Sequence, residues 1–227
     1  MAFELYYTDQ GFGTPLILLH GNGESSEYFK NQITHFSRLY RVIAVDTRGH
    51  GRSPRGVSPF TLEQFAEDLY QLLTKLEIKK ANLLGFSDGG NIALIFALKY
   101  PDYVNRLVLN GANLYPEGLK KSFLIPAEAL FYLSCALSKV SRKAARRREF
   151  FRLMVKEPDI LPEELGTLDI PTLVIAGSKD LIKEKHTGLI ADSLPNARLC
   201  FLPGGHNIAK AQSVEFNQTV EKFLEES

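Results

Sequence analysis

Cysteine is scarce in this sequence, with Cys135 and Cys200 the only two among 227 residues. Two cysteines are too few for a disulfide framework, and their separation matches no metal-binding motif. We therefore expect both to be buried free thiols. The histidines likewise show no metal-binding spacing, so the sequence predicts no metal site.

Long apolar runs are also missing. No segment reaches the run of about 18 apolar residues that indicates a transmembrane helix. The N-terminal stretch around Phe3 to Tyr7 lacks the basic start and the apolar core of a signal peptide. Neither sign of charge dominates: 27 Lys and Arg oppose 26 Asp and Glu, and a net charge of +1 does not favour nucleic acid or an acidic membrane as partner. These absences predict a globular cytoplasmic protein with no membrane span.

Apolar runs that are typical of buried strands alternate with segments of helical periodicity along most of the chain. The predicted strands are 3–7, 15–20, 41–46, 81–86, 104–111, 171–177 and 197–203. The predicted helices are 26–37, 61–76, 91–100, 183–193 and 215–224. This alternation predicts an α/β fold, with a mostly parallel sheet of about eight strands and helices on both faces.

One segment, residues 113–168, has helical character but no convincing strand. Because it follows the carboxyl end of a strand, we expect a small helical cap over the edge where ligands bind in open α/β sheets. The predicted core therefore consists of residues 1–112 and 169–227. The basic run 139–148 is interpreted as a solvated helix face, with contact to an anionic substrate or surface as the alternative.

The stretch 83–91 carries the clearest chemical signal. Its sequence LLGFSDGGN contains the G-x-S-x-G pattern between a predicted strand and a predicted helix. The glycines allow strand and helix to approach closely, and the tight turn would hold the Ser87 hydroxyl out from the sheet edge. We therefore predict Ser87 as a catalytic nucleophile.

Acyl transfer by a serine needs a base and a group that orients the base. His206 is the leading base, in a Gly-Gly-His loop that follows a predicted strand. Asp180 is the leading orienting carboxylate, because it leaves the preceding strand at the same edge. Asp169 comes before its strand and should lie at the opposite edge. The order Ser, Asp, His matches that of elbow-type enzymes.

Backbone N–H groups should bind the oxyanion. The predicted donors are Asp88, which follows the nucleophile at a helix start, and Asn22 in the loop after the 15–20 strand. The Asp88 side chain has two interpretations. It complements the helix N-terminus and points to solvent, or it faces the pocket and binds a substrate cation such as the ammonium group of an amino-acid ester.

Five motifs together resemble the α/β-hydrolase superfamily: HGNG at 20–23, DTRGHGRS at 46–53, GFSDGG at 85–90, GSKD at 177–180 and GGH at 204–206. The S-D-G-G elbow and the ending PGGHNIAKAQSVEFNQTVEKFL are similar to the valacyclovir hydrolase, or biphenyl hydrolase-like, branch. That resemblance implies amino-acid esters as substrates. Members that use an aspartate or a cysteine as nucleophile are disfavoured, because Ser87 stands at that position.

The sequence therefore predicts a serine hydrolase that cleaves a small carboxylic ester, possibly an amino-acid ester, through an acyl-enzyme. The predicted partner is a small-molecule acyl substrate, and no cofactor is implied. Carbon–carbon bond hydrolysis or a lyase reaction on the same triad is the enzymatic alternative. A ligand-binding receptor or scaffold on the same fold is the other alternative. The sequence does not indicate an oligomeric state.

Overall fold

A computed structural model describes residues 3–226, and these form one seven-stranded sheet with the strand order β1-β3-β2-β4-β5-β6-β7. β1 pairs antiparallel with β3, and every other pair of neighbours is parallel. The strands are β1 (Tyr7–Gln10), β2 (Pro15–Leu19), β3 (Arg41–Val45), β4 (Ala81–Phe86), β5 (Val104–Asn110), β6 (Thr172–Gly177) and β7 (Ala197–Leu202). The predicted α/β fold is confirmed, with seven strands among the described residues rather than about eight.

The predicted strand at 3–7 is wrong in position, since β1 begins only at Tyr7. Residues before β1 bind the loop after β3 instead of a neighbouring strand. The N–H of Tyr6 donates to Ser53 Oγ at 2.7 Å, and the guanidinium of Arg48 lies 3.7 Å from the centre of the Phe3 ring. The Tyr6 carbonyl accepts from the N–H of Asp46, directly after β3, at 2.9 Å, so only the Tyr6 N–H is bound to a side chain.

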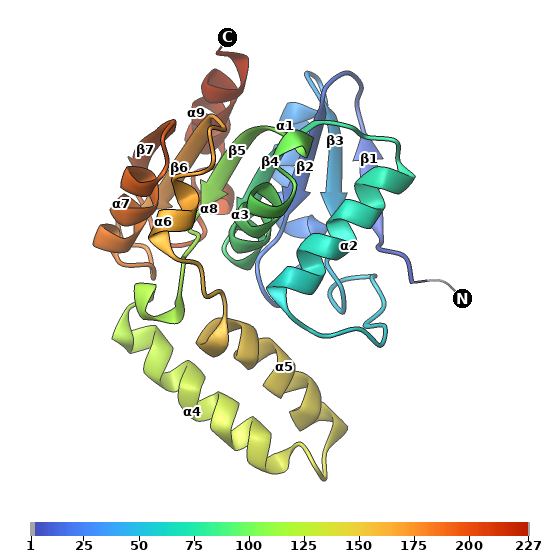
Figure 1. Cartoon of the computed structure of the whole chain (residues 1–227), viewed down its shortest axis with the longest axis vertical. Helices are drawn as coiled ribbons and strands as arrows, with labels where there is room; N and C mark the ends of the chain where they lie inside the picture. The colour runs from blue at the N-terminus through green and yellow to red at the C-terminus, as the bar shows by residue number, and fades with distance from the viewer. Residues whose placement is uncertain (1–2, 227) are drawn as a thin grey trace.

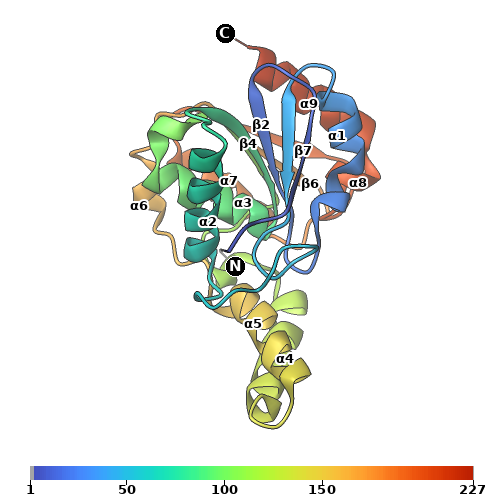
Figure 2. The ribbon, with the colours of Figure 1, turned by 90° about the vertical axis from the view of Figure 1, so that its right-hand side faces the viewer.

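Helices cover both faces of the sheet (Figures 1 and 2). One face packs against α1 (Lys30–Phe36), α8 (Ile208–Ala211) and α9 (Ser213–Glu225), and the other against α2 (Leu62–Lys75), α3 (Asp88–Lys99) and α7 (Glu184–Ser193). Short 3-10 helices lie at Ser26–Phe29, Pro101–Tyr103 and Pro116–Gly118. The central strands are therefore buried on both sides, as their continuous apolar runs predict.

Two long helices, α4 (Lys121–Leu137) and α5 (Arg142–Lys156), lie side by side beyond the sheet, and the short α6 (Pro162–Leu165) follows them (Figure 1). Their residues fall within 113–168, the segment predicted as a cap. The division into this cap and a core of 1–112 and 169–227 stays a prediction. Residues 1, 2 and 227 of that core lie outside the described range.

Two further features concern exposure. Cys135 and Cys200 are free but only partly buried, so the expectation of two buried thiols is wrong. Cys135 lies on α4 beyond the sheet and Cys200 on the outermost strand β7, so each is partly open to solvent. Among residues 3–226, no helix combines the length and apolar character needed to cross a bilayer.

Candidate active site

Ser87 occupies a strained turn between β4 and α3. Its φ of 54° and ψ of −122° are unusual for a residue with a side chain. The turn is held by hydrogen bonds, including the Ser87 N–H to the Asn110 carbonyl at 2.8 Å. Close approach depends on glycine: a Cβ at Gly85 would lie 2.2 Å from the Gly89 oxygen, and a Cβ at Gly89 would lie 2.0 Å from the Leu19 oxygen. The sharp turn predicted at Ser87 is therefore present.

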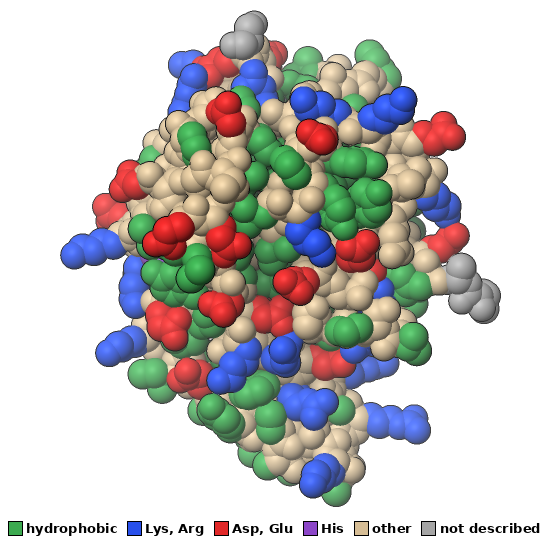
Figure 3. Space-filling model, viewed as in Figure 1, with side chains coloured by type: hydrophobic (Ala, Val, Ile, Leu, Met, Phe, Trp, Pro, Cys, Tyr) green, Lys and Arg blue, Asp and Glu red, His purple; other side chains and the backbone are tan. Residues whose placement is uncertain are grey.

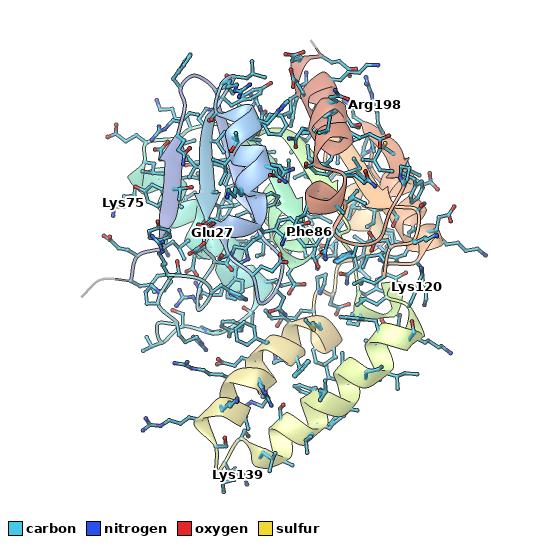
Figure 4. The ribbon with its side chains drawn as sticks, turned by 180° about the vertical axis from the view of Figure 1, so that it is seen from behind. Glu27, Lys75, Phe86, Lys120, Lys139 and Arg198 are labelled. Carbon is cyan, nitrogen blue, oxygen red and sulfur yellow. The ribbon has the colours of Figure 1, made fainter. Side chains whose placement is uncertain are left out.

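A cavity of about 200 Å³ opens above this turn and contains the predicted site. Residues at or after the carboxyl ends of five of the parallel strands line it, together with Phe123 of α4, Met154 of α5 and Glu157, which directly follows α5. The lining residues are Gly21, Asn22, Glu24, Phe86, Ser87, Asp88, Asn113, Leu119, Phe123, Met154, Glu157, Leu181, Ile182, His206 and Asn207. Figure 4 shows Phe86, which precedes Ser87, at the junction between the sheet and the outer helices α4 and α5. The carboxyl ends of the strands thus converge on Ser87, Asp88, Asn22 and His206.

His206 is paired with Asp180 behind the cavity. The distance from His206 Nδ1 to Asp180 Oδ1 is 2.6 Å. Burial raises the pKa of Asp180, but the hydrogen bond and charge of His206, together with the N–H groups of Ile182 and Gly177, outweigh burial and lower it. Asp180 is therefore a carboxylate that orients His206 through Nδ1, which leaves Nε2 available toward the cavity.

Two contacts set the position of the His206 ring. Gly111 has a φ of 62°, and a Cβ there would lie 2.8 Å from His206 Cε1. The Phe86 ring packs on the other side, with 4.8 Å between the ring centres. Across the described residues no hydrogen bond joins Ser87 to His206. Catalytic hydrogen bonds are often long in structures without substrate and shorten when it binds.

The two predicted oxyanion donors are free in the described part of the chain. Neither the N–H of Asn22 nor that of Asp88 donates to a protein acceptor, although both residues line the cavity. The Asp88 N–H is unpaired because it starts α3, where the first-turn N–H groups have no partner within the helix. Unpaired N–H groups beside a nucleophile are suited to bind developing negative charge.

His20 fixes the direction of the Asn22 N–H. Its Nε2 accepts from the Thr47 N–H at 3.0 Å, so the proton is on Nδ1, which donates to the Gly21 carbonyl at 2.7 Å. Burial lowers the pKa of His20, consistent with this neutral form. Because a trans peptide directs its C=O and N–H oppositely, fixing the Gly21 oxygen turns the Asn22 N–H the other way. Sequence reasoning assigned no such role to His20.

The Asn22 side chain bonds to the outer helices. Its Nδ2 donates to the Phe150 carbonyl of α5 at 2.9 Å, and its Oδ1 lies 3.4 Å from His50 Nε2. Burial and the neighbouring His20 lower the pKa of His50 to about 4, so this ring is neutral and packs among Phe60, Phe65 and Phe150. The loop after β2 is thereby fixed to α5.

The Asp88 side chain lies in the first turn of α3 but is buried, so the expectation that it points to solvent is wrong. Only 8% of the residue is exposed, and its Oδ2 has no hydrogen-bond partner in the described structure. Burial and the charge of Glu157 raise its pKa to about 7, although His206 acts in the opposite direction. A buried, unpaired carboxyl group beside Ser87 is unfavourable without a ligand.

Two more carboxylates, which the sequence reasoning missed, line the same cavity. Glu24 has a buried Oε2 without a partner, and burial raises its pKa. Glu157 accepts from the Leu62 N–H at 2.7 Å and forms an ion pair with Arg152. No lysine or arginine is among the described residues that line this cavity, so its lining is acidic. Glu24 directly follows the HGNG motif, whereas no sequence motif marks Glu157.

Comparison with known proteins agrees with this geometry. Residues 14–134 match the family described as alpha/beta hydrolase fold. Human serine hydrolase BPHL is 32% identical over 246 residues, covering 98% of this chain and 83% of the relative. This likeness confirms the resemblance to the valacyclovir hydrolase branch.

Solved structures show the same likeness over nearly the whole chain. A meta-cleavage product hydrolase from Pseudomonas fluorescens is 27% identical with a TM-score of 0.79, covering 97% of this chain and 93% of that one. A thermophilic esterase from Thermogutta terrifontis is 25% identical with a TM-score of 0.77, covering 97% and 92%. The chain therefore belongs to the α/β-hydrolase fold family and is a hydrolase.

Proposed function

We propose that this hydrolase cleaves small carboxylic esters, with preference for amino-acid esters, through a Ser87, His206 and Asp180 triad. Ser87 attacks the acyl carbon while His206 accepts its proton. The N–H groups of Asn22 and Asp88 bind the oxyanion. His206 then protonates the leaving alcohol and an acyl-enzyme remains. In the second half, His206 activates a water molecule, which releases the acid and restores Ser87.

The acidic lining of the cavity carries the preference for amino-acid esters. Asp88 is adjacent to the nucleophile in the chain, so a cation on the acyl group would reach it while the acyl carbon lies at Ser87. Opposite charges 4 Å apart gain about 4 kcal/mol at an effective dielectric of about 20, before the cost of desolvation. An ammonium group would also keep Asp88 ionised, because an adjacent positive charge lowers a carboxyl pKa.

The first experiment tests the triad. Ser87→Ala should abolish labelling by a fluorophosphonate probe and reduce ester turnover to the residual ~10³–10⁴ advantage over water that binding and the oxyanion site provide. The variant should keep its circular dichroism spectrum, since Ser87 contributes little to the apolar core. If the Ser87→Ala variant retained more than about a tenth of the wild-type kcat with any ester, Ser87 would not be the nucleophile.

The second experiment tests the preference. We would compare kcat/KM for alanine methyl ester and for its deaminated analogue, methyl propionate. The ratio should favour the amino ester in the wild type and fall in Asp88→Asn and Glu24→Gln. Glu27→Gln is a matched control, because Glu27 is exposed and does not line the cavity. Equal values for the two esters in the wild type would contradict the preference but leave the triad intact.

Carbon–carbon bond hydrolysis on the same triad is the second candidate. Its support is the likeness to the Pseudomonas fluorescens meta-cleavage product hydrolase. The two candidates separate in one assay, in which the purified protein is given both amino-acid esters and a vinylogous diketone. Cleavage of the diketone with no ester turnover would favour this second function. The acidic lining of the cavity supports the ester.

A further inference from the structure

A second, larger cavity lies between the two outer helices. Its volume is about 500 Å³, and it shares Asn22 and Met154 with the catalytic cavity, so the two spaces adjoin. From α4 it is lined by Leu130, Leu133 and Leu137, which recur at helical spacing on one face. We call this space the cap groove. Figure 4 shows side chains of α4 and α5 pointing into the space between the helices, with Lys139 at the far end.

The cap groove is apolar but open. Its three leucines keep 45%, 56% and 46% of their surface exposed, although they face the neighbouring helix. Packing of α4 against α5 would ordinarily cover such side chains, and exposing them to water is unfavourable. The groove is thus suited to receive an apolar chain.

Two cations line the same groove from α5. Lys143 and Arg147 are four residues apart, are both exposed, and within residues 3–226 neither forms an ion pair. By contrast, Arg55 pairs with Glu149 of α5, and Arg152 of α5 pairs with Glu157. The groove therefore has a basic end without a partner, whereas the catalytic cavity has an acidic lining.

We propose that the cap groove binds the leaving alcohol of the substrate, and that this alcohol is an apolar chain ending in an anionic group held by Arg147 and Lys143. The proposal rests on the ester hydrolase function proposed above and names its substrate class. Met154 lies beside the catalytic cavity, and Arg147 and Lys143 precede it by seven and eleven residues. At 1.5 Å per residue, the anion would lie about 10 to 16 Å along α5 from that point.

Charge complementarity favours this occupant over a lipid surface or a second copy of the chain. Arg142, Arg146 and Arg148 are also exposed on α5 but do not line the groove. Figure 3 shows hydrophobic side chains and Lys or Arg side chains together on the lower end of the molecule, formed by α4 and α5. If the whole basic surface mattered, these arginines would contribute as much as Arg147. If the groove matters, only the residues that line it would contribute.

The experiment uses two alanine esters that differ in one group. Their alcohols are ω-hydroxyoctanoic acid, which is anionic, and ω-hydroxyoctanamide, which is neutral and of the same shape. In the wild type kcat/KM should be higher for the carboxylate, and the advantage should shrink as salt is added. Arg147→Ala should reduce the ratio of the two values about two- to fivefold, as expected for an exposed ion pair, and Lys143→Ala should also reduce it. Arg146→Ala makes the same charge change outside the groove and should leave the ratio unchanged.

Two results would overturn the proposal. Equal kcat/KM for the carboxylate and amide esters in the wild type would show that the groove selects no anion. An equal effect of Arg146→Ala and Arg147→Ala would assign the preference to the general basic surface. Hydrolysis of alanine methyl ester, measured in parallel, keeps the two proposals apart. If the methyl ester is cleaved and the long esters show no preference, only the cap groove proposal fails; if no ester is cleaved, the proposed function fails.

Discussion

Because Asp88 is buried, we expect the free energy of unfolding to fall as pH rises. In the unfolded chain its carboxyl group ionises near 3.8, but in the folded protein its pKa is about 7, first because of burial and second because of Glu157. Between these two pH values the folded state binds a proton that the unfolded state has lost. The contribution of this group is therefore fully present below about pH 3.8 and is lost as pH rises through about 7.

The magnitude follows from the two values. Each pH unit between them is worth about 1.4 kcal/mol, so ionising Asp88 in the folded state costs about 4 kcal/mol. Asp88→Asn has a similar shape and cannot ionise. The measured quantity is the unfolding free energy of Asp88→Asn minus that of the wild type. This difference should be up to about 4 kcal/mol larger at about pH 8 than at about pH 4.

Urea unfolding followed by circular dichroism, for both proteins at several pH values, would measure this difference. Glu27→Gln provides the control, because it removes an exposed carboxylate outside the cavity. If the difference between wild type and Asp88→Asn did not change with pH, the carboxyl group would ionise normally in the folded protein. Asp88 would then not be an unsatisfied carboxyl group that a substrate cation stabilises.

Three further predictions concern positioning and stability. His20→Phe keeps the ring volume but releases the Gly21 carbonyl, so kcat should fall by up to about 10²-fold, with a smaller change in KM; equal kcat would refute the proposed orientation of Asn22. Gly111→Ala should lower kcat because its new Cβ would lie 2.8 Å from His206 Cε1; steady-state kinetics at saturating ester would measure the loss, and an unchanged kcat would show that the ring can move at no cost. Arg48→Ala should lower the free energy of unfolding by about 3 to 5 kcal/mol, because it leaves buried Asp68 without its charge partner; a double variant with Asp68→Leu should lose less, measured by urea unfolding.

Much of the fold can be predicted because its signals are local. The apolar runs of β2 to β7 and the turn at Ser87 each depend on neighbouring residues, so a single sequence suffices. The start of the predicted 61–76 helix is also set locally, because Thr61 Oγ1 accepts from the Gln64 N–H at 3.2 Å and caps α2. The error at residues 3–7 has a different origin, because the partner of Tyr6 is Ser53, 47 positions along the chain.

The site was predictable only where loops end at a shared sheet edge. That rule brings Asp180 and His206 together without any contact information. It says nothing of where a side chain such as that of Asp88 points, because the answer depends on which groups bury it. The position of Glu157 depends on a tertiary contact, because its side chain accepts a hydrogen bond from the Leu62 N–H. No sequence pattern around Glu157 indicates this contact.

Asn22 joins the loop after β2 to helix α5. Its N–H belongs to the loop after β2, and its side chain is tied to the Phe150 carbonyl of α5 at 2.9 Å. A shift of α5 by more than the tolerance of that hydrogen bond must either break the bond or displace the loop. The position of α5 and the direction of the Asn22 N–H are therefore coupled. A substrate that separates α4 from α5 would change both together.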